Sequence, residues 1–127
     1  MSNLPVIILI SSESCGWCKK FAPEWEKLKA KLNGRARFVS FRVRPGESLP
    51  SALSDFVSDG KGWLPMIIMT SAAEYGKYFT SDDRVISSIG KMRANRYNAI
   101  EEEGKIKPAN NPNTADAIAL WFRQSSR

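Results

Sequence analysis

The chain has 127 residues, of which 43% are hydrophobic and 25% are charged, a composition typical of one globular domain and not of a disordered or membrane-spanning chain. Its formal net charge of +6 attracts acidic partners, but a basic surface alone does not indicate nucleic-acid binding, which we do not expect. The apolar run near the start lacks a basic leader and a cleavage site, so we expect no signal peptide and a cytoplasmic protein, whose thiols are normally kept reduced.

The first half of the chain predicts strands and helices in alternation. The continuous apolar run PVIILI at residues 5–10 predicts a strand that is buried on both faces. At residues 18–32 apolar side chains recur three and four positions apart, which predicts an amphipathic helix ended by Asn33–Gly34. The alternation in ARFVSFRV, residues 36–43, predicts a second strand, and residues 49–57 predict a short second helix.

The second half predicts two more strands and a closing helix. MIIM at residues 66–69 predicts a third, buried strand, and residues 77–80 predict a fourth strand after a turn. The apolar positions of residues 115–122 predict the closing helix, with Asn113 or Thr114 as its N-cap.

Residues 81–112 carry mixed signals. Residues 85–89 fit an extension of a strand and residues 93–103 fit a helix, whereas KPANNPN at residues 107–113 is typical of a loop. We expect this segment to be an insertion or elaboration within a single domain, residues 1–127. The order of elements predicts an α/β fold in which a mixed sheet of four to five strands is flanked by helices.

The chain has two cysteines, Cys15 and Cys18, and no histidine. Zinc takes four ligands, so two thiols without histidine do not complete a site within one chain, and we expect no metal. Two buried, inert thiols are a second alternative. The third alternative is a redox couple, which the placement of the pair favours.

A redox couple gives a reason for each position of the C-x-x-C motif. Cys15 lies where the buried strand gives way to the helix, and the unpaired N–H groups at a helix N-terminus favour the thiolate form. Cys18 follows one turn later on the same side, and Gly16 allows the backbone of a partner to approach closely. Cys15 would then attack a substrate disulfide, and Cys18 would resolve the mixed disulfide that forms.

The segment CGWCKKFAPEWEKL resembles the active-site helix of the thioredoxin superfamily, and most of all the protein disulfide isomerase branch with its C-G-x-C-K-x-x-A-P-E pattern. Pro23 matches the proline inside that helix. Leu64–Pro65, followed by MIIM, resembles the cis-proline segment that faces the active site and holds the substrate backbone. The closing TADAIALWF also resembles the last helix of such domains. The resemblance implies a thioredoxin-like fold, catalytic residues Cys15 and Cys18, and substrate contacts at Gly16, Trp17, Leu64 and Pro65.

The same resemblance implies an activity. It implies a thiol–disulfide oxidoreductase without a bound cofactor, recycled by a thioredoxin reductase or by glutathione. We expect it to reduce protein disulfides, because we expect the chain to be cytoplasmic, and to be a monomer with no membrane partner. Three alternatives stay open: a redox-sensing or partner-binding module of the same fold, a glutaredoxin-like reductase that depends on glutathione, and a basic protein associated with nucleic acid. The best local support for the last is KMRANRY at residues 91–97, and Ser81–Asp82–Asp83 is the nearest match to the glutathione-holding Gly-Asp pair of glutaredoxins.

The sequence also departs from the family pattern. Leu9 stands where the family often keeps a buried acid that helps to deprotonate the second cysteine, and Glu13 is the nearest remaining carboxylate. Trp17 replaces the proline of typical thioredoxins or the histidine of disulfide isomerases. That histidine stabilises the thiolate in the family, so its loss should make the couple less oxidising. An exposed Trp17 would contact a substrate or reductase, whereas a Trp17 folded onto the sheet edge would only shield Cys18. We favour the exposed position.

Overall fold

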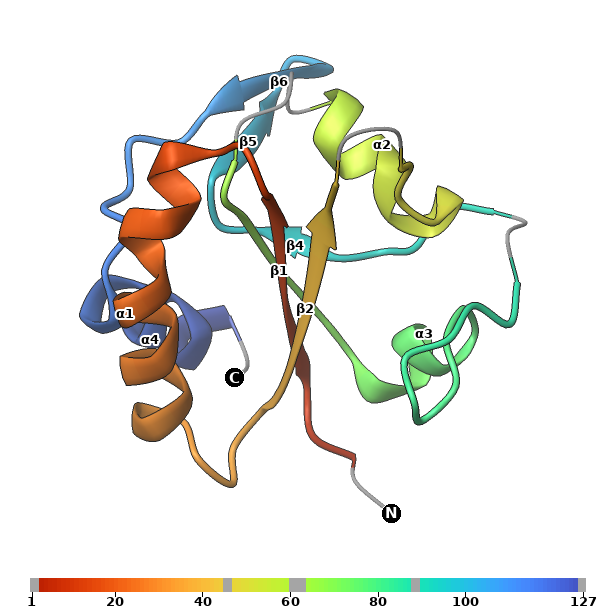
Figure 1. The fold of residues 1–127 in the computed structure, drawn as a ribbon, viewed down its shortest axis with the longest axis horizontal. Helices are drawn as coiled ribbons and strands as arrows, with labels where there is room; N and C mark the ends of the chain where they lie inside the picture. Colours follow the sequence, from red (N-terminus) through yellow and green to blue (C-terminus); the bar gives the residue numbers. More distant parts are fainter. Residues whose placement is uncertain (1–2, 45–46, 60–63, 88–89, 126–127) are drawn as a thin grey trace.

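The computed structural model describes residues 3–44, 47–59, 64–87 and 90–125 (Figure 1). No helix within these ranges has the length and apolar character needed to span a bilayer. The helices and strands of the described chain follow one another in the order β1 (Val6–Ser12), α1 (Gly16–Lys31), β2 (Arg37–Val43), α2 (Ser51–Asp59), β3 (Met66–Thr70), α3 (Ala72–Gly76), β4 (Asn95–Arg96), β5 (Ala99–Glu102), β6 (Lys105–Pro108) and α4 (Ala115–Ser125).

The main sheet has four strands in the order β2-β1-β3-β4, and β5 pairs with β6 in a separate hairpin. Strand β1 runs parallel to β2 and antiparallel to β3, and β3 runs antiparallel to β4. Helices α1 and α4 lie on one side of this sheet, and α2 and α3 lie on the other (Figure 1). The predicted α/β fold with a mixed sheet flanked by helices is therefore confirmed.

The core forms on both faces of β1, as the run PVIILI predicts. Alternate side chains of a strand point to opposite faces, so Ile7 and Leu9 pack with α1 and α4, whereas Ile8 and Ile10 pack with α2 and α3. All of these side chains are buried. Strand β3 is buried along its whole length in the same way.

The predicted elements of the first half are confirmed, with small shifts at their ends. Helix α1 begins two residues before the predicted start, with Cys15 as its N-cap, and Pro23 lies inside it. The positive φ of Gly34, 78°, fits the left-handed conformation expected after the helix. The closing helix is also confirmed, as α4. Thr114 caps its start, because Thr114 Oγ1 accepts the N–H of Ala117 at 3.3 Å.

The fourth strand predicted at residues 77–80 is wrong. Helix α3 takes the place of the predicted turn, capped by Ser71, and the chain after it makes a single bridge between Phe79 and Val85. Tyr78 and Phe79 are buried against the sheet, and the ring of Phe79 stacks on that of Tyr75 at 4.7 Å. The apolar pattern of this segment thus reflects burial, without strand pairing. Residues 88–89 of the proposed strand extension lie outside the described residues.

The helix predicted at residues 93–103 is also wrong, because β4 and the β5–β6 hairpin occupy this part of the chain. Glu103 and Gly104 have φ angles of 54° and 74°, and two positive φ angles in succession form the tight turn that matches the twist of a hairpin. Lys107 and Pro108, predicted as loop, belong to β6. The hairpin is attached to the main sheet by Asn98, whose Oδ1 accepts the N–H of Ile67 at 2.7 Å.

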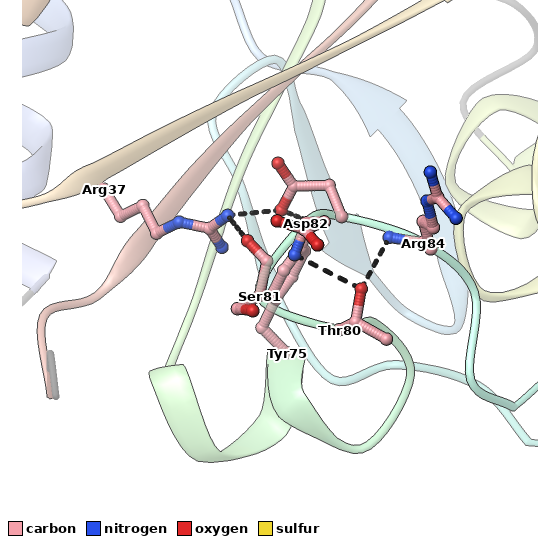
Figure 2. A network of polar contacts seen from close by, with 7 residues as sticks. Arg37, Tyr75, Thr80, Ser81, Asp82 and Arg84 are labelled. Carbon is pink, nitrogen blue, oxygen red and sulfur yellow. Dashed lines mark hydrogen bonds and ion pairs between the residues drawn. The ribbon is translucent and has the colours of Figure 1, made fainter.

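A polar cluster joins the segment after α3 to the sheet. Figure 2 shows Arg37 reaching from β2 toward residues 80–84, where its guanidinium donates to the carbonyl of Ser81 at 3.0 Å and to Asp83 Oδ1 at 2.5 Å. The hydroxyl of Tyr75 donates to the same carboxylate at 2.8 Å. Burial, followed by this hydrogen bond, raises the pKa of Tyr75, so the phenol stays neutral.

This cluster lies at the opposite end of the sheet from Cys15. Arg37 is paired with Val6 at the start of β1, whereas Cys15 follows the end of that strand. The Ser81–Asp82–Asp83 segment is therefore bonded to β2 and α3 at the far end of the sheet and does not reach the cysteines. Its comparison with the Gly-Asp pair of glutaredoxins is wrong for this chain.

We expect Asp83→Asn to lower the free energy of unfolding by about 1–2 kcal/mol, because Arg37 and Tyr75 lose a shared charged acceptor. Asparagine tolerates the left-handed φ of 62° at this position, so the backbone is conserved. Urea titration followed by circular dichroism measures the change. Asp82→Asn is the matched control, since Asp82 contributes its backbone N–H to Thr80; equal losses in both variants would contradict the role of Asp83.

Candidate active site

Both cysteines lie where β1 ends and α1 begins. The turn that joins β1 to α1 is fixed by two backbone hydrogen bonds. One runs from the N–H of Glu13 to the carbonyl of Val43 at 3.0 Å, and the other from the N–H of Cys15 to the carbonyl of Ser12 at 3.1 Å. The first of these ties the turn to the end of β2, which runs parallel to β1. The turn thus sits at the carboxyl edge of the two parallel strands, where α/β proteins commonly place functional groups.

The sulfur of Cys15 lies between the helix and the segment before β3. Cys15 has φ −87° and ψ 113°, an extended backbone that directs its side chain over the first turn of α1. Its Sγ accepts the N–H of Cys18 at 3.1 Å, and its thiol donates to the carbonyl of Leu64 at 3.7 Å. Residues 49 positions apart in the sequence therefore meet at this sulfur.

Cys18 lies one turn into the helix and is half-buried, and both cysteines are free thiols. Burial, followed by the contact with Cys15, raises the pKa of the Cys18 thiol to about 11. A backbone hydrogen bond with Ser12 and the charge of Arg42 act in the opposite direction. The Cys18 thiol is consequently protonated at neutral pH.

The remaining predicted site residues surround the two sulfurs. Gly16 is exposed, and a Cβ built there would meet no atom within 4 Å. The side chain of Trp17 is 71% exposed, with the ammonium of Lys20 at 4.7 Å from its ring centroid, so it does not fold onto the sheet edge. Leu64 is half-buried and Pro65 is buried, and the peptide bond between them is cis.

A cavity of about 560 Å³ opens beside Cys18, between α1 and the paired strands β1 and β2. We call it the Cys18 groove. Its wall includes Leu9 and Pro65, and charged side chains from three elements line it. These charged residues are Glu13, Lys19, Glu26 and Arg42.

Within the described ranges, no three Cys, Asp or Glu side chains are grouped as metal ligands, and the chain has no histidine. The chemistry available to the site is that of two neighbouring thiols.

The thioredoxin family model matches residues 1–54, which contain β1, α1 and β2. Among solved structures, the Trx4 domain of ERdj5 is similar to the chain with a TM-score of 0.56 and 14% identity, over 99% of this chain and 82% of that one. The protein has the thioredoxin fold. Chloroplastic thioredoxin z gives a TM-score of 0.52 at 20% identity, over 98% of this chain and 80% of that one.

The larger structure of ERdj5 in form II is also similar, with a TM-score of 0.56 and 14% identity over 98% of this chain. The chain spans 12% of that protein, so the match concerns one of its parts. No curated protein matches the chain by sequence. At these low sequence identities the structural similarity shows the fold alone, so the activity must be argued from the site itself.

One residue of this thioredoxin-fold site, Arg42, is missing from the set that the sequence predicts. The alternation of apolar and polar residues in β2 places Ser40 and Arg42 on the same face of the strand, because they are two residues apart. That face proves to be the one under α1, because both residues line the Cys18 groove. Which face of β2 lies under α1 depends on the register with β1, and the sequence of β2 does not contain it.

The raised pKa of Cys18 makes the alkylation of this thiol pH-dependent in a testable way. In Cys15→Ser, which removes the contribution of Cys15 but keeps the burial of Cys18, we expect the iodoacetamide rate of the folded protein to keep rising with pH beyond the point at which the unfolded protein levels off. The same variant unfolded in urea should level off near the ordinary value of 9.0. Circular dichroism verifies that the folded sample stays folded. A folded profile that bends near pH 9 would contradict the burial of Cys18.

Proposed function

We propose that this protein is a thiol–disulfide oxidoreductase that reduces disulfide bonds in other proteins through Cys15 and Cys18. The observation that carries the proposal is the position of Cys15 Sγ, which accepts the Cys18 N–H at the start of α1 and contacts the Leu64 carbonyl. A helix N-terminus stabilises an anionic sulfur by its unpaired N–H groups and its dipole. The thioredoxin fold, with a second thiol one turn away, supports the same conclusion.

The reaction consists of two exchanges. The thiolate of Cys15 attacks one sulfur of the substrate disulfide, the substrate S–S bond breaks, and the departing thiolate takes a proton from solvent. Cys18 then loses its proton and attacks Cys15 Sγ, which breaks the mixed disulfide and releases the second substrate thiol. The substrate disulfide gains two electrons, and the two cysteines lose two electrons and form a disulfide.

The unequal environments of the two thiols give this sequence its order. Cys15 is the N-cap of α1 and its sulfur accepts the N–H of Cys18, whereas burial raises the pKa of Cys18 to about 11 and keeps that thiol protonated. A protonated, half-buried thiol is a poor nucleophile toward a disulfide in solution. Cys18 becomes effective once the mixed disulfide places an electrophilic sulfur beside it.

The exposed surface next to Cys15 is suited to contact a protein substrate. Trp17 presents most of its ring to solvent, and Gly16 leaves the adjacent backbone accessible. Large exposed aromatic residues often dominate protein interfaces. On the other side of the sulfur, Leu64 and Pro65 complete the proposed substrate-binding set.

The physiological setting is part of the proposal. Reduction of protein disulfides requires that the cysteines be returned to the dithiol form, either by a thioredoxin reductase or by glutathione. We propose a monomer that works in the cytoplasm, where both systems keep thiols reduced.

An insulin reduction assay with dithiothreitol tests the activity. We expect the wild type to accelerate insulin precipitation and Cys15→Ser to abolish the acceleration, because the attacking sulfur is lost. Thermal unfolding of each variant ensures that lost activity does not reflect lost structure. Acceleration that survives in Cys15→Ser would contradict the assigned nucleophile.

Cys18→Ser provides the complementary measurement. Without a resolving thiol, Cys15 should remain linked to its substrate, so covalent complexes that dissociate in reductant should accumulate with disulfide-bonded insulin. The double variant Cys15→Ser, Cys18→Ser is the matched control and should form none. If Cys18→Ser also forms none, the two-step reaction is wrong, and a partner-binding or sensing role becomes the better explanation.

For Trp17→Ala we expect KM for a protein disulfide to rise about tenfold, the usual cost of losing an interface hot spot, with little change in kcat. Reduction of a small aromatic disulfide should be unaffected, because it does not need the extended contact. Leu120→Ala is the matched control, since Leu120 is an exposed apolar residue on α4 with 55% of its surface accessible. Equal effects of both variants would argue against a substrate contact at Trp17.

A further inference from the structure

The Cys18 groove lacks the buried carboxylate that the family resemblance leads one to expect behind the second cysteine. Leu9 occupies that place and is 7% exposed, packed in the core with α1 and α4. An apolar side chain neither accepts a proton nor stabilises a charge. In the second exchange, where Cys18 must become a thiolate, any electrostatic help therefore comes from elsewhere in the groove.

Four charged side chains line the groove, and they differ in what they offer to a forming thiolate. Glu13 from the turn and Glu26 from α1 are exposed carboxylates, and Glu26 is already paired with Lys29 at 2.9 Å. A negative charge disfavours a neighbouring thiolate. The two cations are Lys19 on α1 and Arg42 on β2.

Arg42 lines the same groove as Cys18. In the parallel pairing of β1 and β2, Leu9 lies opposite Ser40 and Ser11 lies opposite Arg42. These four residues share one face, because each pair is separated from the next by two positions on both strands. That face is covered by α1, so the register brings the side chain of Arg42 to the same cavity as the Cys18 thiol.

We propose that Arg42 is a positioning residue for the resolving step, in which its guanidinium stabilises the Cys18 thiolate that attacks the mixed disulfide. The proposal rests on the proposed function. The proton of Cys18 passes to water or buffer through the open groove, because a guanidinium cannot accept it. The Cys18–Cys15 S–S bond forms as the bond between Cys15 and the substrate breaks, and the substrate thiolate takes up a proton from solvent.

The opposing effects on Cys18 support this assignment. Burial raises the pKa of Cys18, the backbone hydrogen bond with Ser12 lowers it most, and Arg42 is the charged side chain that adds a smaller lowering. Since a sulfur with a lower pKa is also a weaker nucleophile, about half of such a change appears in the rate. An exposed arginine acts through well-hydrated space, so an effect on the resolving rate of about threefold is in keeping with its position.

A single-turnover reaction with one equivalent of 4,4′-dithiodipyridine separates the two exchanges. The first thiopyridone is released when Cys15 attacks, and the second is released when Cys18 resolves the Cys15–pyridine disulfide. The reagent is uncharged above neutral pH, so removal of a cation does not change its approach. Cys18→Ser should release the first equivalent alone, which assigns the second phase to Cys18.

For Arg42→Met we expect the second phase to be about threefold slower from pH 7 to 9, with the first phase unchanged. The difference between Arg42→Met and the wild type should shrink as the salt concentration rises, because salt screens the charge of Arg42, which a loss of packing would not produce. Arg42→Lys should restore most of the rate, because it restores the charge. Arg35→Met, which removes an exposed arginine before the start of β2, should match the wild type.

The outcomes distinguish this proposal from the function on which it rests. If the first phase is missing in the wild type, the oxidoreductase itself is wrong. A normal first phase with an unchanged second phase in Arg42→Met would overturn the role of Arg42 and leave the oxidoreductase intact. A larger loss of the second phase in Glu13→Gln or Glu26→Gln than in Arg42→Met would assign the step to a carboxylate and also overturn the proposal.

Discussion

The pairing of β1 with both of its neighbours is the constraint on which the candidate site depends. Strand β1 is buried on both faces, runs parallel to β2, and meets β3 with Ile10 opposite Met66. That register brings the end of β1 next to the residues that precede β3. Cys15 therefore meets the Leu64 carbonyl, although neither the C-x-x-C motif nor the helix that follows it specifies this contact. The burial of one apolar strand thus determines which surface faces the nucleophile.

From that placement follows the difference between the two thiols, which share the same side chain. Cys15 is the N-cap of α1, so its sulfur accepts the N–H of Cys18 in the first turn. Cys18 is one turn further in, where the sheet and the helix remove part of its hydration and raise its pKa to about 11. Burial is the largest contribution, with the contact between the sulfurs second. One turn of helix thereby separates a sulfur at the helix N-terminus from a thiol whose pKa is raised, which is the asymmetry that a two-step exchange requires.

The parts of the structure that the sequence predicts correctly are those with local signals. The buried run of β1, the apolar stripe of α1 and the Thr114 cap follow from spacing and residue type alone, and so does the proximity of Cys15 to Cys18. The errors arise where burial and pairing are non-local. Tyr78 and Phe79 look like a strand because they are buried, and the two-residue turn at Glu103–Gly104 was the overlooked sign of a hairpin. The place of Arg42 required the register of two strands, which no local pattern contains.

The buried Leu9, an apolar residue in the wall of the Cys18 groove, has consequences for both stability and chemistry. Burying a leucine stabilises the fold by about 1.5–3 kcal/mol, whereas an unpaired carboxylate in the same position would be costly to desolvate. The core between β1 and α1 is consequently apolar, and the charged side chains of the site are exposed ones that line the Cys18 groove. Charges at a rim remain hydrated, so they cost little to fold but act weakly and are screened by salt. If exposed charges assist Cys18, the rate at which it attacks the mixed disulfide should depend on pH and ionic strength. That dependence should be stronger than for a thiol assisted by a buried carboxylate.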